Sequence, residues 1–279
     1  MRVENSAFYP FILCAALLSG PVLAQAQEDA ASAAHRLVVR CGLSVQLRSI
    51  PKGFSDQTKQ MRGQVPDTLL AALEEAGKEA FRADLLQDEV ERILAISMKV
   101  PAMKQAIAWL ETDLGRRVTL AEELASVTMD EAALKKYAGT AKAPSARRVK
   151  MLQDILGVTN GVETTATIME AMALGVAIGV DSTQPVQKRA GVALLRAQIR
   201  KAMPPEKIKE LVKQRMPGVF AYTYRDISDA DLAAYVAFLR GPAGKGYNDA
   251  IMEALSQALV GASVRMGQIL EQAGTRQPV

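Results

Sequence analysis

Two short patterns in the sequence have the spacing of known catalytic motifs. Gly241-x-x-Gly244-Lys245-Gly246 resembles a phosphate-binding loop, but Leu239 stands where that loop has a glycine, and no Ser or Thr follows the lysine. The pattern also follows a helical segment and not a strand. Ser49-x-x-Lys52 has the spacing of an acylating serine–lysine pair, yet no Lys-Thr-Gly or Ser-Asp-Asn segment follows it. Neither pattern predicts a catalytic site.

Residues that bind metals or transfer protons are scarce in this chain. His35 is the single histidine, and it lies in an Ala-rich segment that we expect to be frayed. Cys41 is the single cysteine after Cys14, which lies in a predicted signal peptide, so we expect no intramolecular disulfide and a small buried thiol. Zinc sites need more nitrogen and sulfur ligands than these. We therefore expect no metal and no cofactor.

Carboxylates occur in neighbouring pairs, at Asp88/Glu89, Glu122/Glu123 and Asp229/Asp231. Acidic residues favour helix starts and exposed faces, which is the interpretation we adopt for these pairs. A hydrolase needs two carboxylates that face each other across a cleft, and spacing along the chain does not reveal such a pair. The sequence thus predicts no catalytic residue, and a carboxylate-dependent hydrolase acting on envelope material remains the alternative.

One short pattern occurs in both halves of the chain. In each copy an aromatic residue is followed six positions later by a glycine and then directly by a cation: Trp109, Gly115 and Arg116 in the first, Phe238, Gly244 and Lys245 in the second. We interpret the pattern as structural, with the aromatic on an inward helix face. The glycine would cap a helix or let the next helix approach closely, and the cation would cover helix-end carbonyls or face water.

The beginning of the chain has the features of an export signal. An apolar run extends from Phe8 to Leu18, and Val22-Leu23-Ala24 then supplies small residues for cleavage after Ala24, with Ala26 as the alternative. The run falls short of the roughly 20 residues that span a bilayer. We therefore expect a cleaved signal peptide over 1–24, a periplasmic location and no transmembrane segment after cleavage.

Helix signals dominate the rest of the chain and predict an all-α helical bundle. Aromatic residues make up only 5% of the sequence, whereas Ala, Leu and Met are common, a composition that suits helix-on-helix packing. The segment 43–50 fits either a strand or a helix. We expect capping at Asp84, Thr119, Thr128 and Ser228, and expect helices to span the following ranges: 66–82, a segment from Pro101 to a stop at Gly115, 185–202, 204–216, 228–240 and a long last helix that begins at Pro242.

The organisation of the chain suggests two related units. A segment rich in Ala, Gly, Pro, Ser and bases lies between the two copies of the repeated pattern, so we expect a first helical unit over 25–137, a linker over 138–149 and a second unit over 150–279. Residues 135–217 carry 15 Lys and Arg against six acids. This excess fits either solvated helix faces or docking to an anionic surface.

A resemblance to a known family rests mainly on residues 204–270. Ser228-x-x-Asp231-Leu232, then Tyr235-x-x-Phe238-Leu239-Arg240-Gly241-Pro242-Ala243-Gly244-Lys245, resembles the hallmark of the bacterial domain-of-unknown-function 2059 family, with weaker similarity over 66–125. The chain has Gly241 where the family usually has serine, and Leu239 in place of a second aromatic. The resemblance implies an exported helical protein, and it supplies no catalytic residues.

The apolar segment from Ile168 to Val180 is the strongest pointer to a ligand. We expect a fully buried central helix in which Gly175 and Gly179 allow close packing. The alternative is an apolar lining for a lipid or hydrophobic peptide, with Met169 and Met172 as adaptable contacts. The sequence therefore predicts an exported, non-catalytic envelope protein that binds a partner, an anionic surface or an apolar ligand. Nucleic acid is not expected, because aromatic residues are not interleaved with the basic ones.

Overall fold

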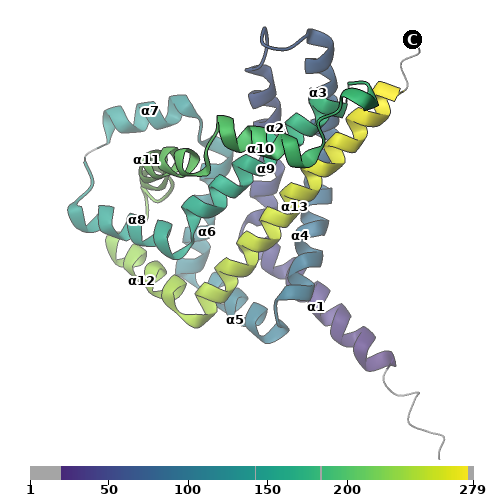
Figure 1. Cartoon of the computed structure of the whole chain (residues 1–279). Coiled ribbons are helices and arrows are strands. Elements are labelled where there is room, and N and C mark those ends of the chain that lie inside the picture. Colours follow the sequence, from purple (N-terminus) through teal and green to yellow (C-terminus); the bar gives the residue numbers. More distant parts are fainter. Residues whose placement is uncertain (1–19, 142, 183, 276–279) are drawn as a thin grey trace, which may run out of the picture.

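The computed structural model describes residues 20–141, 143–182 and 184–275 of the chain, and these residues form an all-α bundle without a strand (Figure 1). The α-helices are α1 (Gly20–Arg40), α2 (Leu43–Lys59), α3 (Asp67–Ala80), α4 (Ala83–Ser97), α5 (Val100–Leu110), α6 (Asp113–Thr128), α7 (Glu131–Thr140), α8 (Ala146–Val158), α9 (Gly161–Ser182), α10 (Val192–Ala202), α11 (Pro205–Thr223), α12 (Asp229–Arg240) and α13 (Pro242–Thr275). The predicted fold class is confirmed.

Several helices begin where a short polar side chain accepts a hydrogen bond from the backbone of the first turn. Such caps satisfy N–H groups that have no partner within the helix. The four capping residues in the described chain are Thr112 for α6, Asp130 for α7, Ser145 for α8 and Ser228 for α12. The predicted caps are therefore correct at Ser228 and wrong elsewhere.

The predicted helix start at Thr119 lies inside a helix, and the one at Thr128 falls on the last residue of that helix, shortly before α7 begins at Glu131 with Asp130 as its cap. Thr112 already caps α6, so the helix runs without a break through Thr119 and Glu122 to Thr128. Thr119 is buried, and the Thr128 hydroxyl donates to the carbonyl of Leu124, so neither side chain is available to cap a new helix. The predicted stop at Gly115 is also wrong, because α5 ends at Leu110 and Gly115 lies in the first turn of α6.

Two further boundaries differ from the prediction for local reasons. The chain after Pro185 makes only the short 3₁₀ turn Val186–Lys188, and α10 begins later, after Gly191 at a φ of 76° that favours glycine. Asp84 does not cap α4, because its carboxylate pairs with Arg82, the residue that precedes the helix.

The segment that follows the predicted cleavage site contributes to the core instead of fraying. Ala33, Ala34, Leu37 and Val38 of α1 are buried, so the small residues there allow neighbouring helices to approach. His35 points away from this face, is exposed, and has its Nδ1 atom 2.9 Å from Glu91 Oε1. The segment 43–50 belongs to helix α2. Most of the predicted signal peptide, residues 1–19, lies outside the described residues.

The long helix α13 belongs to the second predicted unit, but it packs into the core of the first. Its inner stripe, which includes Ile251, Leu259 and Met266, joins a hydrophobic core built otherwise from α1 to α5. A second core combines Val118 of α6 with residues of α8 and α12 and of the turn after α11, and includes Leu232. The loop between α7 and α8 falls within the predicted linker, but cores extend across it, so the division at 138–149 does not separate two independent cores.

Candidate functional site between helices α9, α10 and α13

The aromatic residues of the repeated pattern contact each other. The rings of Trp109 at the end of α5 and Phe238 at the end of α12 stack with centroids 3.8 Å apart and planes 4° apart. Both side chains are partly buried. Their contact lies between the first and second hydrophobic cores, and Trp109 packs against both.

The two glycines of the pattern have the same local environment. A Cβ atom on Gly115 would collide with the carbonyl oxygen of Trp109 and lie 2.7 Å from Leu110 Cα, and one on Gly244 would collide with the carbonyl oxygen of Phe238. Each glycine thus allows the start of one helix to pack directly on the end of the preceding helix. This similarity is limited to the two turns, and the duplication of whole units stays a prediction.

The two cations of the pattern differ in their contacts. The guanidinium of Arg116 donates to the carbonyl of Glu111 at the end of α5 and pairs with Asp113 at 2.6 Å. Lys245 instead pairs with Asp249 one turn along α13. All six residues of the pattern therefore have structural contacts.

The apolar segment around Ile168 forms part of α9, which is longer and less buried than the sequence suggested. The window Gly161–Ile178 is long and apolar enough by composition to cross a membrane, although it contains Glu163 and Glu170. Only 28% of this window is buried in the protein, so the expectation of a fully buried helix is wrong. One face of α9 packs on α13, and another lines a groove.

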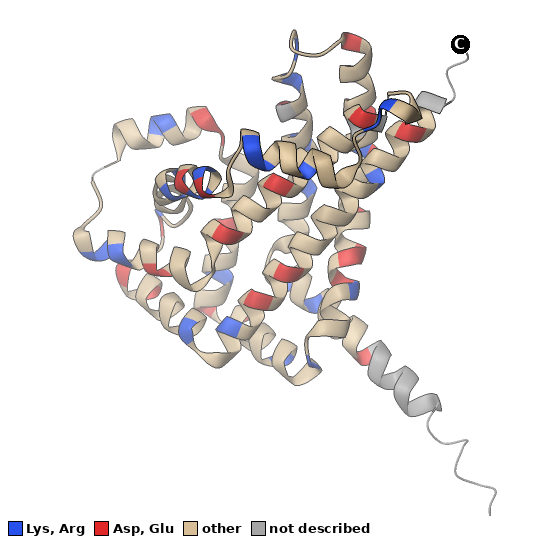
Figure 2. Cartoon of the chain, viewed as in Figure 1, with Lys and Arg blue, Asp and Glu red and all other residues tan. Residues whose placement is uncertain are grey.

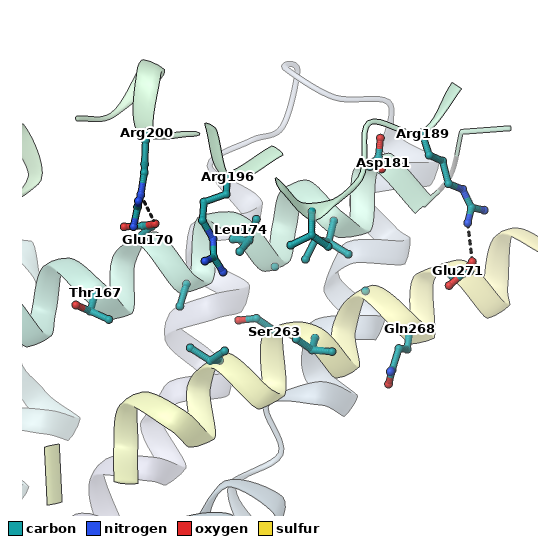
Figure 3. Close-up of a pocket in the computed structure, with 17 residues that line it drawn as sticks. Thr167, Glu170, Leu174, Asp181, Arg189, Arg196, Arg200, Ser263, Gln268 and Glu271 are labelled. Atoms are coloured by element: carbon teal, nitrogen blue, oxygen red, sulfur yellow. Dashed lines mark hydrogen bonds and ion pairs between the residues drawn. The ribbon is translucent and has the colours of Figure 1, made fainter. Parts of the chain in front are cut away.

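Small residues bring α9 and α13 together at the floor of this groove. A Cβ atom on Gly175 would lie 2.6 Å from Ser263 Cβ, and one on Gly267 would meet the Ile178 side chain. The expected close packing at Gly175 is thus observed. Because the two helices approach so closely, the larger side chains beside the contact surround an open groove between α9, α10 and α13 (Figure 3).

The groove has a volume of about 460 Å³ and a largely apolar floor. Val264 is 47% exposed although it lies on the same helix as the buried stripe, because its side chain faces the groove and not the core. Apolar residues contributed by three helices line the groove: Ala171, Leu174, Ile178, Val192, Val260 and Val264. Met169 and Met172 do not line it, so the predicted role of these methionines as contacts is not observed here.

Three arginines on and before α10 lie along the groove (Figure 3). Arg200 pairs with Glu170 at 2.8 Å, and Arg189 pairs with Glu271 at 2.5 Å. Arg196 lies between them along the chain, is exposed, and has no hydrogen-bond or ion-pair partner among the described residues. Among the described residues, Arg196 is therefore the one arginine of the groove lining without an ion pair, and the same lining holds three carboxylates, of which Asp181 binds backbone N–H groups.

The loop before α10 is held in place by Asp181 at the end of α9. Its carboxylate accepts hydrogen bonds from the backbone N–H of Ala190 at 2.8 Å and of Gly191 at 3.3 Å. These bonds fix the point at which the chain enters α10, and α10 in turn packs against α9. Asp181 thus helps to place Arg196 over the groove.

The carboxylates that line the groove are already engaged in hydrogen bonds or ion pairs. Glu170 and Glu271 already form ion pairs with arginine, so they do not form an opposed pair of free carboxylates of the kind that glycoside hydrolysis requires. Within the described ranges, no group of three His, Cys, Asp or Glu is placed to hold a metal ion. Carboxylates elsewhere are also engaged: Asp229 pairs with Arg148, and Asp231 with Arg117.

One wall of the site is predictable from the sequence, and the others are not. The apolar pattern and glycines of 168–180 indicate α9, whereas the arginines belong to a basic segment without a pattern that indicates a site. Blue Lys and Arg positions alternate with red Asp and Glu positions along the helices in Figure 2, so the basic residues of the chain are not gathered in one helix. The feature of the sequence that indicates the other walls of the groove is Arg196, which lies close to apolar Val192 and Leu195 on one short helix.

The chain was compared with protein families, curated proteins and solved structures. No protein-family model, no curated protein and no solved structure matches the chain. The resemblance to the domain-of-unknown-function 2059 family therefore rests on its motif alone.

Proposed function

We propose that this chain is an exported, non-catalytic helical protein of the bacterial envelope that binds an apolar ligand carrying an anionic group. The ligand occupies the groove between α9, α10 and α13. The observation that carries the proposal is the unpartnered Arg196 beside an apolar groove of about 460 Å³. The predicted export signal and the resemblance to the domain-of-unknown-function 2059 family support the proposed envelope location.

The size and lining of the groove suit an alkyl chain. Ligand sites in proteins commonly have volumes of about 300–1,000 Å³ and mostly apolar walls with a few polar groups. Burial of each CH₂ group contributes about 0.8 kcal/mol, so a chain of roughly ten carbons supplies about 8 kcal/mol before the costs of binding. The branched side chains of Val260 and Val264 present this apolar surface on α13.

The charge of the groove selects the head group. A carboxylate or phosphate near Arg196 would form a charge-assisted hydrogen bond, and arginine can hold either group with two parallel bonds. An ammonium head group at the same place would instead meet the like charge of Arg196. The two flanking ion pairs, Arg200–Glu170 and Arg189–Glu271, leave Arg196 as the arginine of the groove with no partner to displace.

A series of ligands that differ only in the head group tests this proposal. Isothermal titration calorimetry would compare dodecanoate, dodecanol and dodecylammonium below their micellar concentrations. We expect dodecanoate to bind most tightly, dodecanol about tenfold or more weakly, and dodecylammonium weakest, because a hydrogen bond to a charged group contributes about 1.5–3 kcal/mol. Equal affinities for the three compounds would contradict the assigned head group.

A single substitution on the floor tests the location of the site. Val264→Asp places a charge in the groove at a position that is already 47% exposed, so it should weaken dodecanoate binding without unfolding the protein. Val127→Asp on α6 is the matched control, because Val127 is 60% exposed and does not line the groove. Similar losses in both variants would place the ligand elsewhere.

Export is tested separately by the mass of the protein recovered from the periplasm. We expect a chain that begins at Gln25 or Gln27, since the signal peptidase sites follow Ala24 and Ala26. Retention of residues 1–24 would contradict cleavage.

A further inference from the structure

A second cavity is lined by residues of α2, α6, α8, α9, α11, α12 and α13, and it shares no lining residue with the groove. Its volume is about 330 Å³. Glu122 of α6 is the one carboxylate in its lining, and no Lys, Arg or His contributes to it. A cavity with one acid and no base favours a cationic occupant over an anionic one.

The carboxyl group of Glu122 is held in place by two tyrosines. Glu122 Oε1 accepts hydrogen bonds from the hydroxyls of Tyr224 at 2.7 Å and Tyr235 at 3.0 Å. The other oxygen, Oε2, has no protein hydrogen-bond partner among the described residues. Protein atoms surround the carboxyl group, yet Glu122 keeps part of its surface accessible, as expected for a group that lines a cavity.

Aromatic rings and one unpartnered amide line the same cavity. Phe220, Tyr224, Tyr235 and Tyr247 all contribute to its wall, and the centroids of the Phe220 and Tyr224 rings are 5.8 Å apart. Asn248 is only 8% exposed, and its Nδ2 atom is buried without a hydrogen-bond partner. A buried amide N–H without a partner is costly, so a ligand that brings an acceptor would relieve this cost.

We propose that this cavity binds a small organic cation of the alkylammonium class that also carries a hydroxyl or carbonyl oxygen. The cationic group would pair with Glu122 among the aromatic rings, whose faces attract weakly hydrated cations. The oxygen would accept from Asn248. Met129, Met216 and Met252 complete the apolar wall, and their flexible side chains can adapt to alkyl groups.

Proton release should accompany binding of the cation. Burial raises the pKa of Glu122, and the hydrogen bonds from Tyr224 and Tyr235 only partly oppose this effect. Glu123 on the same helix raises the pKa further, and burial keeps the hydroxyls of Tyr224, Tyr235 and Tyr247 and the thiol of Cys41 uncharged. A bound cation favours the ionised carboxylate, so affinity should increase with pH.

Choline and its uncharged carbon analogue provide the direct test. In 3,3-dimethylbutan-1-ol a carbon replaces the nitrogen of choline, so the two molecules have nearly the same shape and differ in charge. Calorimetry on the full chain should show choline binding about tenfold or more tightly than the alcohol, and more tightly at pH 8 than at pH 5. No binding of choline at millimolar concentration, or equal binding of both compounds, would overturn the proposal.

Variants locate the bound cation within the cavity. Glu122→Gln should weaken choline binding about tenfold and remove its pH dependence. Glu123→Gln, which alters a neighbouring acid outside the cavity lining, should retain the affinity at pH 8 and a pH dependence that is moved to lower pH, because Glu123 raises the pKa of Glu122. Phe220→Leu, which leaves the carboxylate intact, should weaken choline binding about threefold. Unchanged affinity in both Glu122→Gln and Phe220→Leu would overturn the assignment. The groove variant Val264→Asp should bind choline normally, which separates this site from the proposed function.

Discussion

The indole of Trp109 and the phenyl ring of Phe238 lie nearly parallel, 3.8 Å apart between centroids and 4° apart in plane. The two rings come from equivalent positions of a pattern that occurs in both halves of the chain. Each ring ends a helix whose successor packs back through a glycine. The contact therefore joins two similar helix turns across the molecule.

This ring contact predicts an energetic coupling between its two residues. Trp109→Ala and Phe238→Ala should each destabilise the protein, and the double variant should cost less than the two single changes added together. The expected difference is about 0.5–1.5 kcal/mol, the usual value for an aromatic pair. Chemical denaturation of the four proteins measures it. Strict additivity would contradict an energetic role for the contact.

Alanine at either glycine of the pattern should lower the stability of the protein, whereas alanine at nearby Gly246 should raise it. Gly115→Ala and Gly244→Ala should each lower the free energy of unfolding by about 1–3 kcal/mol, because the added Cβ meets backbone atoms that cannot move freely. Gly246→Ala is the control two residues along α13, since nothing lies within 4 Å of its Cβ position. That change should stabilise the helix by about 0.5–1 kcal/mol. Destabilisation by Gly246→Ala equal to that by Gly244→Ala would contradict the packing account.

The buried carboxyl of Glu122 predicts how stability changes with pH. Because its pKa is raised in the folded protein, the folded state binds this proton more tightly than the unfolded state does. The stabilisation that the protonated Glu122 contributes to the folded state is fully present below pH 4.5, the ordinary pKa of a glutamate. It is lost as the pH rises through the raised pKa of the folded protein. The slope is at most about 1.4 kcal/mol per pH unit for one group. Glu122→Gln should remove this slope in urea titrations between pH 4 and 8, and Glu123→Gln should retain it.

The guanidinium of Arg196, which forms no ion pair among the described residues, predicts a local effect on ligand affinity. Arg196→Glu should weaken dodecanoate binding by about 10–100-fold, because it replaces a charged hydrogen-bond donor with a like charge. Lys213→Glu makes the same change in charge on α11, at an exposed position outside the groove, and should have little effect. General docking to an anionic surface predicts instead that both changes, or the joint reversal of Arg196, Arg200, Lys207 and Lys213, weaken binding to anionic vesicles in a salt-dependent way.

Sequence signals that act over a few residues correctly predict some helix starts and the buried face of the last helix. Ser228 and Pro242 mark helix starts as expected, and the stripe through Ile251, Leu259 and Met266 is the buried face of α13. The same kind of signal failed at Thr119 and Thr128. A residue type that can cap a helix does so only where the helix begins, and that depends on earlier residues such as Thr112.

The candidate sites were less predictable, because they depend on contacts between distant segments. The groove combines residues of α9, α10 and α13 whose positions follow from the close approach of Gly175 to Ser263. Glu122 is likewise bonded to Tyr224 and Tyr235, about a hundred positions along the chain. As a neighbouring acid pair it has the sequence pattern of an exposed helix start, and only the packing of α6 against the end of α11 and α12 buries it.

Photoaffinity labelling would identify the residues that contact a bound fatty acid. A fatty acid with a diazirine midway along its chain would be bound to the protein, irradiated, and mapped by mass spectrometry of peptides. We predict crosslinks on α9 and α13 at groove residues such as Leu174 and Val264, with competition by dodecanoate and strong reduction in Val264→Asp. Crosslinks confined to other surfaces, or labelling that dodecanoate does not reduce, would contradict the assignment of the groove as the ligand site.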